Sequence, residues 1–116
     1  MKLINTTPHT IKVLDSKNTV VRTYPPAEIP LRVEERIVRL MNAEVTPDFT
    51  APVFATTYAE PNLYDMKIDA DVIYITSRIV KHALNASHSY IAHLFVVPTD
   101  LVRDDGVIIG CKSFSL

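Results

Sequence analysis

The chain has 116 residues, 47% of them hydrophobic and 22% charged, and carries a formal net charge of −1. This length is too short for two independent cores and predicts one domain over residues 1–116. The composition is typical of a compact protein and not of a disordered one. A net charge so close to zero produces no field that favours nucleic acid or an anionic membrane, so neither is expected as a partner.

Three features narrow the classes of function further. No apolar run approaches the roughly 20 residues that cross a bilayer, and the first residues hold no apolar stretch of signal-peptide length. The single cysteine, Cys111, cannot form an internal disulfide, so we expect a cytoplasmic protein. The only two glycines, Gly106 and Gly110, cannot form a GxGxxG or GxxxxGK(S/T) loop, which excludes the standard glycine-rich phosphate loops.

The first quarter of the chain predicts a strand, a polar loop and a hairpin. Residues 2–4 have strand character, and residues 10–24 predict two strands around the turn residues 15–18. Two consecutive prolines then end the hairpin, because proline donates no ladder hydrogen bond. Between these segments lies the polar stretch NTTPHT (residues 5–10), which is longer than a turn requires.

The middle of the chain is less regular. Residues 31–41 alternate as a strand at first and also fit one face of a helix, and we expect a strand at their start. Residues 51–61 predict another strand, bounded by prolines, and residues 62–70 predict a loop.

The clearest unit joins a strand directly to a helix. Residues 72–75 form a continuous apolar run typical of a central strand, and Thr76 and Ser77 are preferred residues at a helix N-terminus. Residues 78–84 have the apolar spacing of a helix, and Asn85 is an acceptable C-terminal stop.

The last quarter predicts two strands joined in a hairpin. Residues 90–98 form a second apolar run, which we expect to be a buried strand that includes His93 as a core histidine. Asp105 and Gly106 are a strong signal for a hairpin turn, followed by a strand over residues 107–114. The elements together predict an α/β protein of the strand-dominated α+β kind: one small domain with a mixed sheet, about one clear helix and a C-terminal hairpin.

The strand-to-helix turn is the strongest candidate for an anion-binding site. A helix N-terminus presents unpaired N–H groups and a partial positive charge, to which phosphates bind. Ser77 would donate its hydroxyl to a phosphate, and Arg78 would bind two phosphate oxygens. The alternative is that Ser77 only caps the helix and Arg78 is solvated.

The polar loop is the second candidate. His9 has the chemistry to bind a ligand, transfer a proton or coordinate a metal, and Thr7 and Thr10 add hydroxyl groups beside it. The alternative is a structural loop in which His9 caps a neighbouring carbonyl.

Two further places offer polar or aromatic groups to a ligand. Thr99 and Asp100 directly follow a predicted buried strand, where ligand residues gather in α/β sheets, and Arg103 lies in the same polar segment. Alternatively, Arg103 forms a modest surface pair with Asp104. Among the tyrosines, Tyr58 is the one we single out to stack on a base or a sugar.

Metal and nucleophile chemistry find little support. The four histidines repeat no recognised metal-ligand spacing, and the chain has no GxSxG nucleophile elbow. Cys111 lies among apolar residues of a predicted strand, where cysteine packs as a small hydrophobe. We therefore expect no metal, no cofactor and no catalytic residue.

Three segments carry a family resemblance. The opening INTTPHTIKVLD is similar to an NLTPH-type motif, VIYITSRIV to a central YIVS strand-and-helix motif, and VPTDLVRDDGVIIGCKSF to a closing VRDxxGxIIG segment. In this order and over nearly the whole chain, they resemble a family of small proteins from tailed phages and bacteria. The departures are Thr6, where leucine is usual, and residues 41–52, which match poorly.

The resemblance implies a function by analogy of class and size. Small phage proteins of this kind include ones that sequester nucleotide immune signals, such as cyclic ADP-ribose derivatives, without altering them. We expect such a phage protein, acting in the cytoplasm of the infected bacterial host, to bind a signal of ADP-ribose or cyclic-nucleotide type. A homo-oligomer is expected, since a small domain gains burial and deeper pockets between protomers.

Two other classes of function stay open at this point. One is an enzyme that cleaves such a nucleotide, with His9 as general acid or base and Asp100 as its partner. The other is an accessory or inhibitor module that binds a protein.

Overall fold

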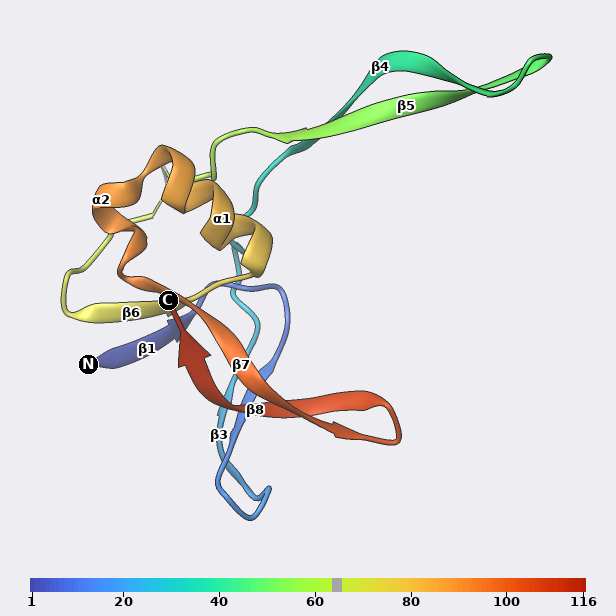
Figure 1. Cartoon of the computed structure of the whole chain (residues 1–116). Coiled ribbons are helices and arrows are strands. Elements are labelled where there is room, and N and C mark those ends of the chain that lie inside the picture. The colour runs from blue at the N-terminus through green and yellow to red at the C-terminus, as the bar shows by residue number, and fades with distance from the viewer. Residues whose placement is uncertain (64–65) are drawn as a thin grey trace.

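A computed structural model describes residues 1–63 and 66–116. Strands account for 51% of the described residues and helices for 12%, which confirms the predicted strand-dominated α+β class with a small mixed sheet. Within the described residues, eight strands and two short helices follow one another along the chain (Figure 1). In chain order they are β1 (Lys2–Asn5), β2 (Ile11–Leu14), β3 (Val20–Tyr24), β4 (Glu35–Thr46), β5 (Phe49–Tyr58), β6 (Val72–Ile75), α1 (Arg78–Ser87), α2 (Ser89–Ala92), β7 (Phe95–Asp104) and β8 (Val107–Ser115).

The body of the molecule is a six-stranded mixed sheet in the order β1-β6-β7-β8-β2-β3. Strand β6 lies between β1 and β7 and is parallel to both, whereas β7 with β8, and β2 with β3, pair antiparallel. A parallel contact between Val13 and Cys111 joins β2 to β8. Helices α1 and α2 form the crossover from β6 to β7 that a parallel pair of strands requires.

Strands β4 and β5 form a separate two-stranded sheet, here called the arm (residues 35–58), which projects from the body (Figure 1). They pair antiparallel from Glu35 and Tyr58 at the root of the arm to Thr46 and Phe49 at its tip. Every arm residue is exposed except two half-buried alanines. The arm stretches the molecule to 59 × 39 × 23 Å, and it contributes nothing to the core of the body.

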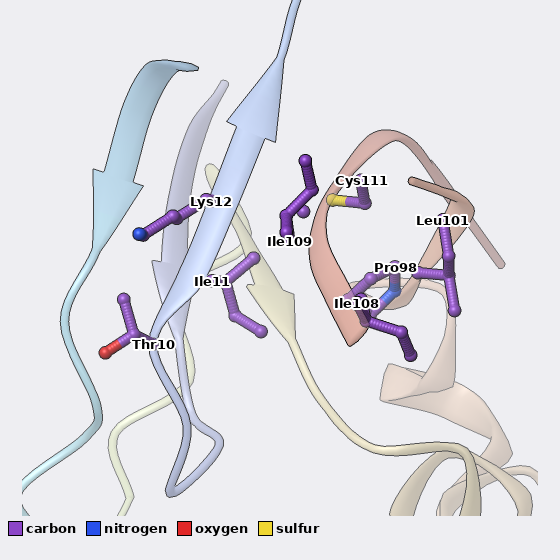
Figure 2. Close-up of a pocket in the computed structure, with 9 residues that line it drawn as sticks. Thr10, Ile11, Lys12, Pro98, Leu101, Ile108, Ile109 and Cys111 are labelled. Carbon is purple, nitrogen blue, oxygen red and sulfur yellow. The ribbon is translucent and has the colours of Figure 1, made fainter. Parts of the chain in front are cut away.

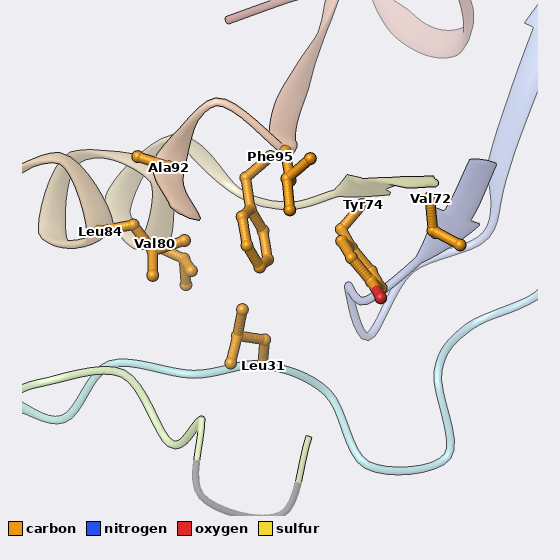
Figure 3. Close-up of a cluster of buried hydrophobic side chains, with 8 residues drawn as sticks. Leu31, Val72, Tyr74, Val80, Leu84, Ala92 and Phe95 are labelled. Carbon is orange, nitrogen blue, oxygen red and sulfur yellow. The ribbon is translucent and has the colours of Figure 1, made fainter. Parts of the chain in front are cut away.

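The core lies where α1 and α2 pack on β6 and β7 (Figure 3). Tyr74 of β6 and Phe95 of β7 stack with their ring centroids 5.2 Å apart. Leu31 reaches this cluster from a segment without regular structure and lies opposite Phe95 (Figure 3). The buried members of the cluster are Leu31, Val72, Tyr74, Val80, Leu84, Ala92, Leu94 and Phe95.

Two predicted hairpins are confirmed. Strands β2 and β3 pair around the turn residues 15–18, and β7 and β8 pair around Asp105 and Gly106. These last two residues have φ values of 50° and 79°, the left-handed backbone that a two-residue hairpin turn of type I′ requires. The residue types at the two turns were therefore sufficient to predict the positions of both hairpins.

The strand predicted at the start of residues 31–41 is wrong, because residues 31–34 form no regular structure. Their backbone bonds to loops instead of to a strand: the N–H of Leu31 donates to the carbonyl of Thr6, and that of Arg32 donates to the side chain of Asn62. The strand begins only afterwards, as β4.

The strand predicted over residues 90–98 is wrong in its first part. A helical turn, α2, forms there because the N–H groups of residues 91–92 donate to the carbonyl of His88, and β7 begins only at Phe95. His93 is exposed and is not the core histidine expected from the apolar run. A short apolar run fits a buried helical turn as well as a strand, so its periodicity could not separate them.

Helix α1 follows β6 as predicted but continues to Ser87, beyond the expected stop at Asn85. The N–H of His88 donates to the carbonyl of Leu84 and closes the last turn. No helix in the part of the chain that the structure describes is long and apolar enough to cross a membrane. Of the predicted loop 62–70, residues 64–65 lie outside the described residues, and the others form no helix or strand.

The contact between β2 and β8 depends on the absence of a side chain at Gly110. A Cβ atom there would lie 2.8 Å from the carbonyl oxygen of Lys12 and 2.9 Å from Cγ of Leu14. We expect Gly110→Ala to lower the free energy of unfolding by about 1–3 kcal/mol, because the two strands must separate to admit the methyl group. Chemical denaturation measures the change, with Val107→Thr on the exposed part of the same strand as a near-neutral control. A Gly110→Ala protein as stable as the control would contradict this packing.

Candidate functional site

The polar stretch after β1 is organised around the side chain of Asn5. Its amide nitrogen donates to the carbonyl oxygens of His9 at 2.7 Å and Pro25 at 2.9 Å. Its Oδ1 accepts from the backbone N–H of Thr7 at 2.9 Å and from the Thr7 hydroxyl at 2.7 Å. One buried amide therefore holds the turn closed, an arrangement for which asparagine is suited because it offers both donors and acceptors.

The same stretch is tied to the rest of the body through Thr6. Its backbone N–H and its hydroxyl both donate to the carbonyl oxygen of Ile75, at 2.9 and 2.6 Å, and its own carbonyl accepts from Leu31. The carbonyl of Thr7 accepts from Ala27. These bonds use the polar groups of residues 5–7, which are buried, and leave residues 8–10 exposed.

The start of α1 faces this loop. Ser77 has extended backbone, with φ −78° and ψ 160°, and its side chain accepts from the N–H of Val80 at 3.3 Å. The serine thus caps the helix, as one of the two interpretations of the sequence expects. The first turn holds no acidic residue, and Arg78 is exposed there.

A pocket of about 400 Å³, here called the loop pocket, opens between the polar loop and the helix start. Three residues proposed from the sequence, Thr7, His9 and Ser77, line it together, and Arg32 adds a cation. The remaining walls are mostly apolar. The full lining consists of Thr7, Pro8, His9, Ile11, Leu31, Arg32, Val33, Thr76, Ser77, Ile79, Val80, Val97 and Pro98.

A second pocket of about 330 Å³, here called the helix pocket, lies along α1. It brings together two other predicted residues, Arg78 and Thr99. The hydroxyl of Thr99 lies 2.8 Å from the hydroxyl of Ser113. Lys81 and His82 add nitrogen groups. The lining consists of Arg78, Lys81, His82, Asn85, Val97, Thr99, Ser115 and Leu116.

Lys81 is a buried cation in the wall of the helix pocket. Its ammonium group donates to the carbonyl oxygen of Ala92 at the end of α2. Burial lowers the pKa of Lys81 from its ordinary value, because the charged form loses hydration. An anion bound in the pocket would stabilise the charged form of Lys81 and so offset part of the hydration that burial removes.

The two pockets adjoin each other. Both are lined by Val97 of β7, and the consecutive residues Ser77 and Arg78 belong to one pocket each. Of the residues that the structure describes, no Asp or Glu lines either pocket, whereas Arg32, Arg78 and Lys81 do. Cations at a helix N-terminus oppose the helix dipole, and a bound anion would offset this unfavourable interaction.

Thr10, also proposed as a ligand residue, lies in a neighbouring groove of about 280 Å³ between β2 and β8 (Figure 2). Ile11 and Pro98 line both this groove and the loop pocket. Figure 2 shows Thr10 and Lys12 at one side of the groove and the apolar side chains of β7 and β8 at the other. The groove is lined mainly by apolar side chains.

The other predicted site residues lie elsewhere. Asp100 and Arg103 lie on β7 beyond Thr99, are exposed and line neither pocket. Asp100 has a φ of 50°, a left-handed backbone within the strand. Tyr58 ends β5 at the root of the arm, likewise outside both pockets.

Sequence reasoning missed Arg32, Lys81 and His82. The signal for Lys81 was present, because it follows Arg78 by three residues and so lies on the same helix face. Arg32 had no such signal, since its segment forms no regular element and is placed by distant backbone bonds.

Cys111 lies outside the loop and helix pockets. Cys111 is buried in β8, and burial raises the pKa of its thiol, as expected of a packed cysteine. Among the described residues, no group of three or more His, Cys, Asp or Glu side chains is arranged to hold a metal ion. Comparisons of the chain with protein-family models, with curated proteins and with solved structures gave no match.

The Asn5 network predicts a loss of stability on substitution. We expect Asn5→Ala to lower the free energy of unfolding by about 2–3 kcal/mol, because it leaves buried donors and acceptors without partners. Asn5→Asp keeps the acceptor oxygen but turns a carboxylate oxygen toward the two carbonyl oxygens, so we expect its loss at neutral pH to be at least as large. Denaturant unfolding measures both, with Asn42→Ala on the arm as the control, since Asn42 bonds only to exposed Arg39. Equal stability of Asn5→Ala and the control would refute the structural role of this side chain.

Proposed function

We propose that this protein binds a small phosphate-bearing ligand of nucleotide type in the loop and helix pockets and holds it without altering it. The observation that carries the proposal is the pair of adjoining pockets at the start of α1, lined by cations and, within residues 1–63 and 66–116, by no acidic side chain. Their volumes of about 400 and 330 Å³ are each within the usual range of small-molecule sites.

The two pockets suit different parts of such a ligand. In the helix pocket, Arg78 and Lys81 provide charged donors for phosphate oxygens, and Thr99 adds a hydroxyl. In the loop pocket, the apolar walls would cover a base or ribose, while His9 and Arg32 provide polar contacts. A ligand that bridges both pockets would place its charge beside α1 and its less polar part beside the polar loop.

Binding without turnover is supported by what the pockets lack. Among the described residues, no carboxylate side chain lines them to pair with His9, and Asp100, the partner that the enzyme alternative requires, lies outside both. The Ser77 side chain already accepts a hydrogen bond from the helix backbone. This arrangement favours a binding protein over a hydrolase or transferase.

The biological setting follows from the resemblance to small phage proteins. In that setting the ligand is a nucleotide-derived immune signal, of ADP-ribose or cyclic-nucleotide type, and the protein sequesters it in the cytoplasm of the infected bacterial host. The cations of the two pockets agree with the phosphates that such signals carry.

The first experiment mixes purified protein with a panel of ADP-ribose derivatives and cyclic dinucleotides and measures free ligand before and after heat denaturation. We expect one class to disappear from solution and to return intact on heating. A ligand that returns chemically altered would replace this proposal by the enzyme alternative. A panel left untouched would remove the small-molecule proposal and favour a protein partner.

A variant pair locates the binding in the helix pocket. With the ligand that the panel identifies, we expect Arg78→Ala to raise the Kd roughly ten- to hundredfold, since a charge-assisted hydrogen bond contributes about 1.5–3 kcal/mol. Arg103→Ala removes an equally exposed arginine outside both pockets and serves as the matched control. Isothermal titration calorimetry measures both constants. An unchanged Kd for Arg78→Ala would count against the site.

A further inference from the structure

The arm presents large apolar side chains to solvent along its whole length. Met41, Val45, Phe49 and Phe54 are each more than half exposed, at 60%, 61%, 61% and 55%. A two-stranded hairpin is at best marginally stable in water unless other elements cover it. The arm therefore lacks, among the residues that the structure describes, the packing that would make it stable.

The strand register sorts the arm into two unlike faces. Residues directly opposite each other in an antiparallel pair lie on the same face, and consecutive residues alternate between faces. One face, here called the apolar face, carries three successive apolar pairs and ends in Phe49 at the tip. These pairs are Val38 with Ala55, Met41 with Val53, and Ala43 with Ala51.

The other face is mixed. It alternates polar and charged residues with apolar ones, and it includes the pairs Arg39 with Phe54, Asn42 with Pro52, and Glu44 with Thr50. The mixed face also exposes Ile37 and Phe54, so the faces differ mainly in charge: the mixed face carries three charged residues and the apolar face one.

The whole molecule exposes more surface than a compact chain of its mass. Its accessible area is 8152 Å², against about 6,300 Å² expected for a folded monomer of 13.0 kDa. Its radius of gyration is 18.3 Å, against about 13 Å for a compact domain of this length. The excess area of about 1,800 Å² lies within the range that each chain buries in a large obligate homodimer.

We propose that the arm docks onto a second copy of this chain and that its apolar face is buried at the interface. The excess area matches what such an interface needs. A second copy is present whenever the chain is made, so the arm can be covered without a different protein. The charges of the chain are compatible with such an interface. The apolar face carries one charged residue, Arg36 at its root. A net charge of −1 produces little repulsion between copies.

The test replaces one cross-strand pair on each face with the same opposite charges. Met41→Lys with Val53→Glu changes the apolar face, and Ile37→Lys with Thr56→Glu changes the mixed face. In both variants the new charges lie opposite each other, so the hairpin keeps a favourable cross-strand pair. Circular dichroism checks that each variant is folded, and sedimentation velocity at micromolar concentration measures its mass.

We expect the unaltered chain to sediment with at least twice the 13.0 kDa of one copy. The apolar-face variant should dissociate at least about a hundredfold more readily, because its charges would have to be desolvated at the interface, and the mixed-face variant should assemble as the unaltered chain does. A single-copy mass for the unaltered chain would overturn the proposal and leave the arm for a different protein. Equal assembly of both variants, or equal dissociation of both, would overturn the assignment to the apolar face.

Discussion

The side chain of Asn5 is the interaction on which the arrangement of the body depends. Strands β1 and β2 are consecutive in the chain but lie far apart in the sheet, so the connection between them has to be held by something other than strand pairing. Asn5 closes that connection on itself and binds it to Pro25, while Thr6 joins it to the end of β6 at Ile75. Because Ile75 lies two residues before the helix cap Ser77, the two walls of the loop pocket are linked through one carbonyl oxygen.

The electrostatics of α1 set its start apart from an ordinary structural helix. Its first turn has no acidic residue, its first residue is Arg78, and Lys81 follows one turn later in a buried position. Arg78 in the first turn opposes the helix dipole, and burial removes hydration from the Lys81 ammonium group. Both effects lower the stability of the folded protein. A bound anion would interact favourably with the dipole and both cations at once, as the proposed function requires.

Local chemistry made part of this structure predictable from the sequence. The Asp105–Gly106 turn, the hairpin at residues 15–18 and the Ser77 cap each depend on neighbours a few residues away, and all three are present. Residues 31–34 were mispredicted because their backbone partners are distant in sequence: Thr6 lies 25 residues before Leu31, and Asn62 lies 30 residues after Arg32. The same distinction applies to the candidate site. Ser77 and Arg78 were predicted from the local pattern of a helix start, whereas Arg32 is placed only by the distant backbone bonds.

The arm and the pockets meet at residues 31–34. Leu31 is buried in the core, Arg32 and Val33 line the loop pocket, and β4 begins at Glu35. This short segment is therefore fixed at one end by the core and at the other by the root of the arm. A second copy that holds the arm would also fix the outer end of the segment, and with it the positions of two residues that line the pocket. On the two proposals together, assembly would not only cover an apolar surface but also order one wall of the binding site, so that ligand affinity and self-association are thermodynamically coupled.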